Sequence, residues 1–135
     1  MEVSEREYIR LKNNFLDYYR TGGIKSSSGC HTWNLSKNKG YGKLTVNITL
    51  SSGDRITKTV QAHTYIFKLN NTQFNLLTRI PGGLQVSHLC GRKDCVRLSH
   101  LNLETAKINS SRRPCHSQGF CDSHDEYPDC IYPTS

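Results

Sequence analysis

Apolar residues recur at helical spacing near the N-terminus. In SEREYIRLKNNFLDYYR, four large side chains lie three or four positions apart and share one helical face: Tyr8, Leu11, Phe15 and Tyr18. Ser4 precedes this run and a glutamate follows three residues later, which is the pattern of a helix N-cap. The pattern predicts an amphipathic helix over residues 5–20, followed by a flexible connection in TGGIKSSSG.

Two strictly alternating stretches follow, and they predict a β-hairpin over residues 41–62. Apolar residues alternate with polar ones in GKLTVNITL and in RITKTVQA, and SSGD between them can turn the chain. The polar face consists of Lys43, Thr45, Asn47, Thr49, Arg55, Thr57, Thr59 and Gln61. Such a face is usually solvated, but a two-stranded ribbon also fits the DNA major groove. These eight residues are therefore candidate DNA contacts.

The remaining periodic segments are short. HTYIFKL predicts a short helix, LQVSHLC a strand ending at His88, HLNLE a second strand, and TAKINSSRR a helix with Thr105 at its N-cap. This strand–strand–helix unit spans residues 84–112, and residues 113–135 have little periodicity. Helices combined with antiparallel hairpins indicate an α+β fold, in a single domain of 135 residues.

Positive charge is concentrated in the middle of the chain. The formal net charge is +7, but residues 20–113 alone carry fifteen Lys/Arg against three Asp/Glu. Such a block attracts polyanions, of which nucleic acid is the commonest; basic residues kept for solubility are the alternative. There is no apolar run long enough to span a membrane, and the charged N-terminus is unlike a signal peptide. We therefore expect an intracellular protein, nuclear in a eukaryote.

Cysteines and histidines are numerous enough for two zinc sites. In a reducing compartment, six cysteines are more typical of thiolate ligands than of disulfides. Tetrahedral zinc takes four such ligands, partly from a tight local cluster. The first site is assigned to Cys30, Cys90, Cys95 and His100. The second site is assigned to Cys115, Cys121, His124 and Cys130. The neighbours His31 and His116 are alternatives to Cys30 and His124.

His88 lies two residues before a predicted zinc ligand but has no place in either site. A leftover histidine is most often a packed or surface residue, which is our interpretation of His31, His63 and His116. His88 differs because it ends a strand and precedes a helix that carries Asn109. A one-metal nuclease needs this arrangement: the imidazole takes a proton from water, and the helix residue holds Mg²⁺ at the scissile phosphate.

The segment SHLCGRKDCVRLSHLNLETAKINSSRRPC resembles the His-Cys box of the intron-encoded homing endonucleases, a zinc-bound branch of the ββα-metal nucleases. The resemblance covers residues 30–130 and is strongest over residues 87–115. It implies that His88 is the general base and that Asn109 is the single Mg²⁺ ligand. It also implies that the polar hairpin reads the major groove of double-stranded DNA, with an arginine at the scissile phosphate, for which Arg55 is the candidate.

The chain departs from the family in three places. Arg55 lies eight residues before His63, nearer than in the family pattern, and His124 follows Cys121 after two residues rather than one. Family members dimerise partly through a C-terminal arm, whereas only IYPTS follows Cys130, so a homodimer would need another contact. We expect a Mg²⁺-dependent DNA endonuclease with two structural Zn²⁺ ions. The alternative is a non-catalytic, zinc-stabilised DNA-binding module derived from such a nuclease.

Overall fold

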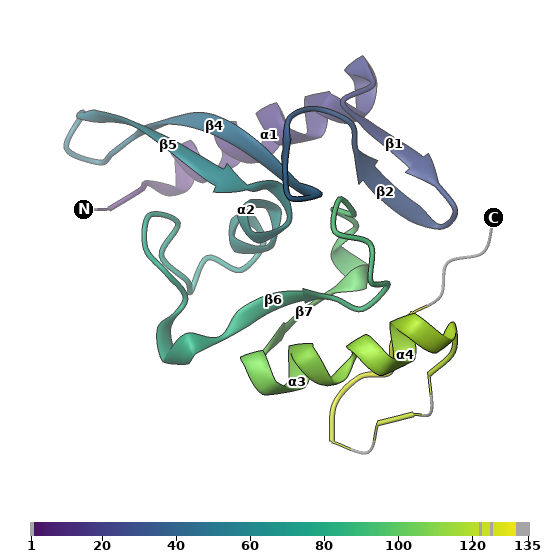
Figure 1. The fold of residues 1–135 in the computed structure, drawn as a ribbon. Coiled ribbons are helices and arrows are strands. Elements are labelled where there is room, and N and C mark those ends of the chain that lie inside the picture. The colour runs from purple at the N-terminus through teal and green to yellow at the C-terminus, as the bar shows by residue number, and fades with distance from the viewer. Residues whose placement is uncertain (1, 122, 125, 132–135) are drawn as a thin grey trace.

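The computed structural model describes residues 2–121, 123, 124 and 126–131, in which helices are combined with antiparallel sheets (Figure 1). The helices are α1 (Glu5–Thr21), α2 (Ala62–Leu69), α3 (Ala106–Ser111) and α4 (Arg113–Gln118). The strands are β1 (Ile24–Ser27), β2 (Cys30–Trp33), β3 (Lys37–Asn38), β4 (Tyr41–Thr49), β5 (Arg55–Gln61), β6 (Gln85–His88) and β7 (Leu101–Glu104). Strand β1 pairs with β2, β3 and β5 flank β4, and β6 pairs with β7. The α+β class predicted from the sequence is confirmed.

Helix α1 packs on the core through the face that the sequence predicted. The Ser4 side chain caps it by accepting a hydrogen bond from the Glu7 backbone N–H at 3.1 Å. Leu11 and Phe15 are buried on its inner face, and the Phe15 ring stacks on Trp33 with centroids 5.8 Å apart. This contact joins α1 to the strand that begins at the first predicted zinc ligand.

The segment after α1 is not the flexible connection that the sequence predicted. Residues 24–27 form β1, which pairs antiparallel with β2 around a turn at Ser28 and Gly29, both with positive φ. Ile24 is buried at the start of the strand, whereas the other three residues of β1 are exposed. Because only one position of the strand is apolar, no alternation reveals it in the sequence.

The β4–β5 hairpin brings the eight predicted DNA contacts onto one face. Its register pairs Lys43 with Gln61, Thr45 with Thr59, Asn47 with Thr57, and Thr49 with Arg55. All of them are exposed except Thr49, which is half-buried. On the opposite face, the ammonium of Lys58 donates to the Leu77 carbonyl. Ala62, predicted as part of the hairpin, is instead the first residue of α2.

Helix α1 also covers the outer edge of β4. Strand β3 pairs only with the first two residues of β4, and no other described strand pairs with the rest of this edge. The Glu7 carboxylate accepts the Thr49 N–H at 2.6 Å, and the Arg10 guanidinium donates to the Asn47 carbonyl at 3.1 Å. Covering an edge in this way prevents it from pairing with another chain.

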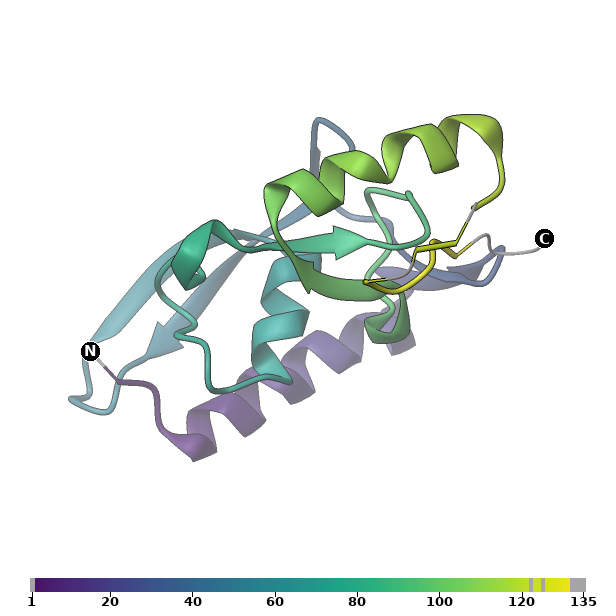
Figure 2. The same cartoon turned by 90° about the horizontal axis from the view of Figure 1, so that it is seen from below.

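Strands β6 and β7 and helix α3 form the predicted strand–strand–helix unit. Gln85 lies opposite Glu104 and His88 opposite Leu101, and the Thr105 side chain caps α3. The helix expected from TAKINSSRR ends at Ser111, and a second helix, α4, which the sequence did not predict, begins at Arg113. Figure 2 shows α3 and α4 on one side of β6 and β7, and α1 and α2 on the other.

Candidate metal centres and cleft

The four residues assigned to the first zinc site converge on one point. They are Cys30, Cys90, Cys95 and His100, all buried, with ligand atoms within 4.8 Å of one another. His100 Nδ1 lies 3.6 Å from the Sγ atoms of Cys30 and Cys95. A tetrahedral zinc with ordinary Zn–S and Zn–N bonds would hold sulfur and nitrogen ligands about 3.6 Å apart. The set therefore fits a closed, structural zinc site.

Backbone pairing brings Cys30 to the other three ligands. The Trp33 N–H donates to the Asp94 carbonyl, and the Val96 N–H donates to the His31 carbonyl, both at 2.8 Å. The His31 ring instead contacts the Tyr19 hydroxyl through Nδ1 at 2.9 Å, so Cys30 is the residue in the cluster. Burial, with help from Cys95, raises the pKa of Cys30 to about 11. A cation among the sulfurs is what would hold them all as thiolates.

The second assigned set also gathers, with one ligand on α4 and three in the segment that follows it. Its members are Cys115, Cys121, His124 and Cys130, with ligand atoms within 4.8 Å of one another. His124 Nε2 lies 3.7 Å from the sulfurs of Cys115 and Cys130, and the Cys115 and Cys121 sulfurs are 4.0 Å apart. A tetrahedral zinc would hold a sulfur and a nitrogen ligand about 3.6 Å apart and two sulfur ligands about 3.8 Å apart. The observed separations are close to these values. His116 lies outside the set, with Nε2 at 3.1 Å from the Leu89 carbonyl.

His88 belongs to neither cluster, although it lies beside the first. It is the last residue of β6, is 9% exposed, and has its Nε2 atom 3.0 Å from the Cys95 carbonyl oxygen. A carbonyl can only accept, so Nε2 carries the proton and the neutral ring has its lone pair on Nδ1. Burial lowers the pKa of His88, and Cys95 opposes this shift. The hydrogen bond orients the ring, and the net lowering of the pKa favours its neutral form.

Two aromatic rings pack near His88 that the sequence did not connect with it. The His63 ring lies 4.2 Å from the His88 ring between centroids, and the Tyr41 ring lies 6.0 Å away. His63 is buried in α2, and this burial, together with the proximity of His88, lowers its pKa to about 3. A neutral His63 packs against His88 without adding charge. Because these residues come from separate elements, their contact leaves no spacing signal.

Asn109 faces the same cleft as His88. Its Nδ2 donates to the Gln85 side-chain oxygen at 2.9 Å, which leaves its own amide oxygen available for a cation. Gln85 begins the strand that His88 ends, so β6 helps to orient both residues. The cleft has a volume of about 1280 Å³ and is lined by His63, His88 and Asn109, among others.

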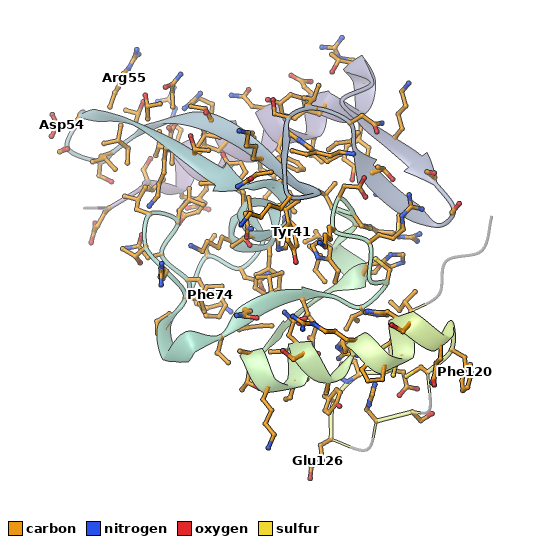
Figure 3. The ribbon with its side chains drawn as sticks, in the orientation of Figure 1. Tyr41, Asp54, Arg55, Phe74, Phe120 and Glu126 are labelled. Carbon is orange, nitrogen blue, oxygen red and sulfur yellow. The ribbon has the colours of Figure 1, made fainter. Side chains whose placement is uncertain are left out.

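Arg55, the candidate for the scissile phosphate, does not line this cleft. It lies next to Asp54 at the turn of the hairpin, away from Tyr41 (Figure 3). Lys58 and Gln61 of β5 do line the cleft, and they lie three and six residues from Arg55, about 10 and 20 Å along the strand. The structure therefore does not bring Arg55 together with His88. The basic residues that line the cleft are Lys58, Lys68, Arg79, Lys93 and Arg113.

These features define a small α+β domain with two Cys3His metal clusters and a strand–strand–helix unit beside a basic cleft. A family model described as the zinc-binding loop region of homing endonuclease matches residues 28–134. The chain belongs to this family, which confirms the resemblance predicted from the His-Cys segment. Comparison with curated proteins and with solved structures gave no match. Across the described residues, no helix has the length and apolar character needed to cross a bilayer.

Proposed function

We propose that the protein is a Mg²⁺-dependent DNA endonuclease in which His88 is the general base and Asn109 is the metal ligand. Membership of the homing endonuclease family supports a nuclease-like role. The observation that carries the finer proposal is the hydrogen bond between His88 Nε2 and the Cys95 carbonyl. This bond holds the ring in the tautomer that can accept a proton at Nδ1, in a cleft that also contains Asn109.

In this mechanism His88 Nδ1 takes a proton from a water molecule as the water oxygen attacks the phosphorus. The bond from phosphorus to the 3′ oxygen breaks, and the leaving oxygen takes a proton from solvent. A bound divalent cation would neutralise the scissile phosphate and stabilise the leaving oxygen. Asn109 offers a single neutral oxygen, which is a weak ligand, so oxygens of DNA and water would have to supply the other ligands of the cation. Retention of the cation would then depend on bound DNA.

Double-stranded DNA is the proposed substrate because the cleft and the hairpin offer complementary contacts. The three exposed basic side chains of the cleft, Arg79, Lys93 and Arg113, can bind backbone phosphates, which supply most of the affinity. The exposed hydroxyl and amide groups of the hairpin can reach base edges in the major groove. Some of these groups already pair with each other: the Thr57 hydroxyl donates to Asn47 Oδ1 at 2.7 Å.

Cleavage of supercoiled plasmid by zinc-loaded protein tests the proposal. With Mg²⁺ present, His88→Ala should cut about 10²- to 10⁴-fold more slowly, because the proton acceptor is lost. Asn109→Ala should also lose activity, and both variants should keep two zinc ions per chain. Asn13→Ala, which changes an exposed asparagine on α1, is the matched control and should cut normally.

Two results would contradict parts of this proposal. If His88→Ala cuts plasmid as fast as the wild type, His88 is not the general base. Wild-type protein that binds DNA but does not cut it with any divalent cation would instead be a zinc-stabilised DNA-binding module.

A further inference from the structure

A buried arginine connects the strand–strand–helix unit to the second metal cluster. Arg112 lies between α3 and α4 and is 1% exposed. Its Nε and Nη2 atoms both donate to the Glu104 carboxylate, Nε at 2.9 Å. Its Nη1 atom donates to the Cys130 sulfur at 3.3 Å. One guanidinium therefore bridges β7 and a ligand of the second cluster.

Glu104 holds this guanidinium in a fixed orientation. The carboxylate also accepts hydrogen bonds from the Ser87 hydroxyl at 2.5 Å and from Asn102 Nδ2 at 3.0 Å. Both of its oxygens are thus shared between the arginine and a neutral donor. A bidentate pair of this kind fixes the plane of the guanidinium, and with it the direction of the third donor, Nη1.

The aromatic side chain of Tyr127 covers the same guanidinium. Its ring centroid lies 5.0 Å from Arg112 Cζ, and the ring stacks on His124, a ligand of the second cluster, at 4.3 Å. The Tyr127 hydroxyl lies 2.8 Å from the Ser111 hydroxyl of α3. Arg112 is therefore in contact, directly or through this ring, with two of the four residues of the cluster.

The positive charge of Arg112 should stabilise the second cluster when that cluster holds a metal. Zn²⁺ bound by three thiolates and a neutral histidine carries a formal charge of −1, and Cys130 is buried. A negative centre in a poorly solvated site is stabilised by a nearby positive charge that donates to one of its sulfurs. Outer partners that orient the ligands of a metal commonly change its affinity by about 10- to 100-fold.

We propose that Arg112 is a positioning residue for the second zinc site: it donates to the Cys130 thiolate, strengthens metal binding there, and anchors the C-terminal loop to the strand–strand–helix unit. The Ile131 N–H next to Cys130 donates to the Leu89 carbonyl at 2.8 Å, and Arg112 adds a contact with the Cys130 sulfur itself. The inference depends on the metal cluster and the ion pair, and it goes beyond the proposed nuclease activity.

The paired variant Arg112→Gln with Glu104→Gln removes the guanidinium without leaving a buried carboxylate unpaired. In zinc competition with a chelating indicator, one of the two sites should lose affinity by about 10- to 100-fold, while the other, the first cluster, serves as an internal reference. In the Co²⁺-substituted protein, loss of the donor should move the sulfur-to-cobalt charge-transfer band to lower energy. Unchanged affinity and an unchanged band would overturn the proposal.

A second variant keeps the test decisive if the paired variant does not fold. Arg112→Lys retains the positive charge opposite Glu104, but an ammonium cannot reproduce the fork that reaches both the carboxylate and Cys130. It should keep the secondary structure by circular dichroism, yet shift the cobalt band and release one zinc more easily. A folded Arg112→Lys protein with wild-type zinc release and a wild-type band would also refute the role. Neither readout requires DNA cleavage.

Discussion

Replacing Glu7 with glutamine tests how α1 closes the open edge of β4. The carboxylate accepts the Thr49 N–H at 2.6 Å and two hydrogen bonds from Arg10, also at 2.6 Å. Glutamine has nearly the same size, but its single oxygen cannot serve both partners. Its amide nitrogen must then face a donor. The substitution therefore removes interactions without creating a cavity.

The two interactions differ in strength because they differ in exposure. The Arg10 side chain is 47% exposed, so the ion pair should contribute only about 0.5 kcal/mol. The Thr49 N–H lies on an edge that α1 covers, and a hydrogen bond to a charged acceptor contributes about 1.5 kcal/mol or more. Glu7→Gln should therefore lower the free energy of unfolding by about 2 kcal/mol, equivalent to about 6–8 °C in Tm for a chain of this size.

Urea unfolding of zinc-saturated protein measures the effect. Asp17→Asn is the matched control, because Asp17 pairs with Arg20 on the same helix at 3.8 Å and both side chains are exposed. This control should change stability by less than about 0.5 kcal/mol. If Glu7→Gln lowers the free energy of unfolding no more than Asp17→Asn does, the edge of β4 does not depend on the carboxylate, and the reasoning fails.

The effect of Glu7 should also depend on pH. Its hydrogen bond with Arg10 lowers the pKa of Glu7 below the ordinary 4.5, against the burial that raises it. A carboxyl group with a lowered folded pKa contributes stability above its unfolded pKa and loses it as the pH falls through the folded value. The difference between wild type and Glu7→Gln should thus be constant from about pH 8 to 5 and shrink below about pH 4.5.

Two further substitutions separate the metal scaffold from DNA contacts. Cys95→Ser should lose the first zinc and unfold the domain, since structural zinc contributes on the order of 10 kcal/mol; a folded, zinc-poor protein by circular dichroism and metal analysis would contradict this. Arg55→Ala should weaken DNA binding and reduce its salt dependence by about one phosphate contact, yet leave the single-turnover cutting rate unchanged. A large loss of the single-turnover cutting rate at saturating protein would indicate that Arg55 takes part in the cleavage step.

Local spacing explains which parts of the site could be predicted from the sequence. Cys90, Cys95 and His100 lie within eleven residues, so short chain segments place three ligands together whatever the rest of the fold does. The same holds for the unit that carries His88 and Asn109, because its two strands and its helix all lie within residues 85–111. Such short spacings can be recognised within one stretch of the sequence.

Contacts between distant segments left no such signal. His63 meets His88 only because α2 packs against β6, and the basic lining of the cleft comes from several elements. The ion pair of Glu104 and Arg112 looks like ordinary surface charge in the sequence, yet both side chains are 1% exposed. Arg55 was assigned from its place in a family pattern, and the hairpin register places it at the turn, outside the residues that line the cleft. Tertiary packing decides each of these cases.

Cys95 unites the scaffold and the proposed chemistry in one residue. Its sulfur belongs to the first metal cluster, and its carbonyl holds His88 Nε2 at 3.0 Å. A metal bound to the sulfur would also hold the peptide group a few bonds away, so the imidazole would be oriented by the backbone of a zinc ligand rather than by a mobile side chain. In a domain with few apolar residues, this arrangement gives the proposed base a rigid support without requiring a large core around the cleft.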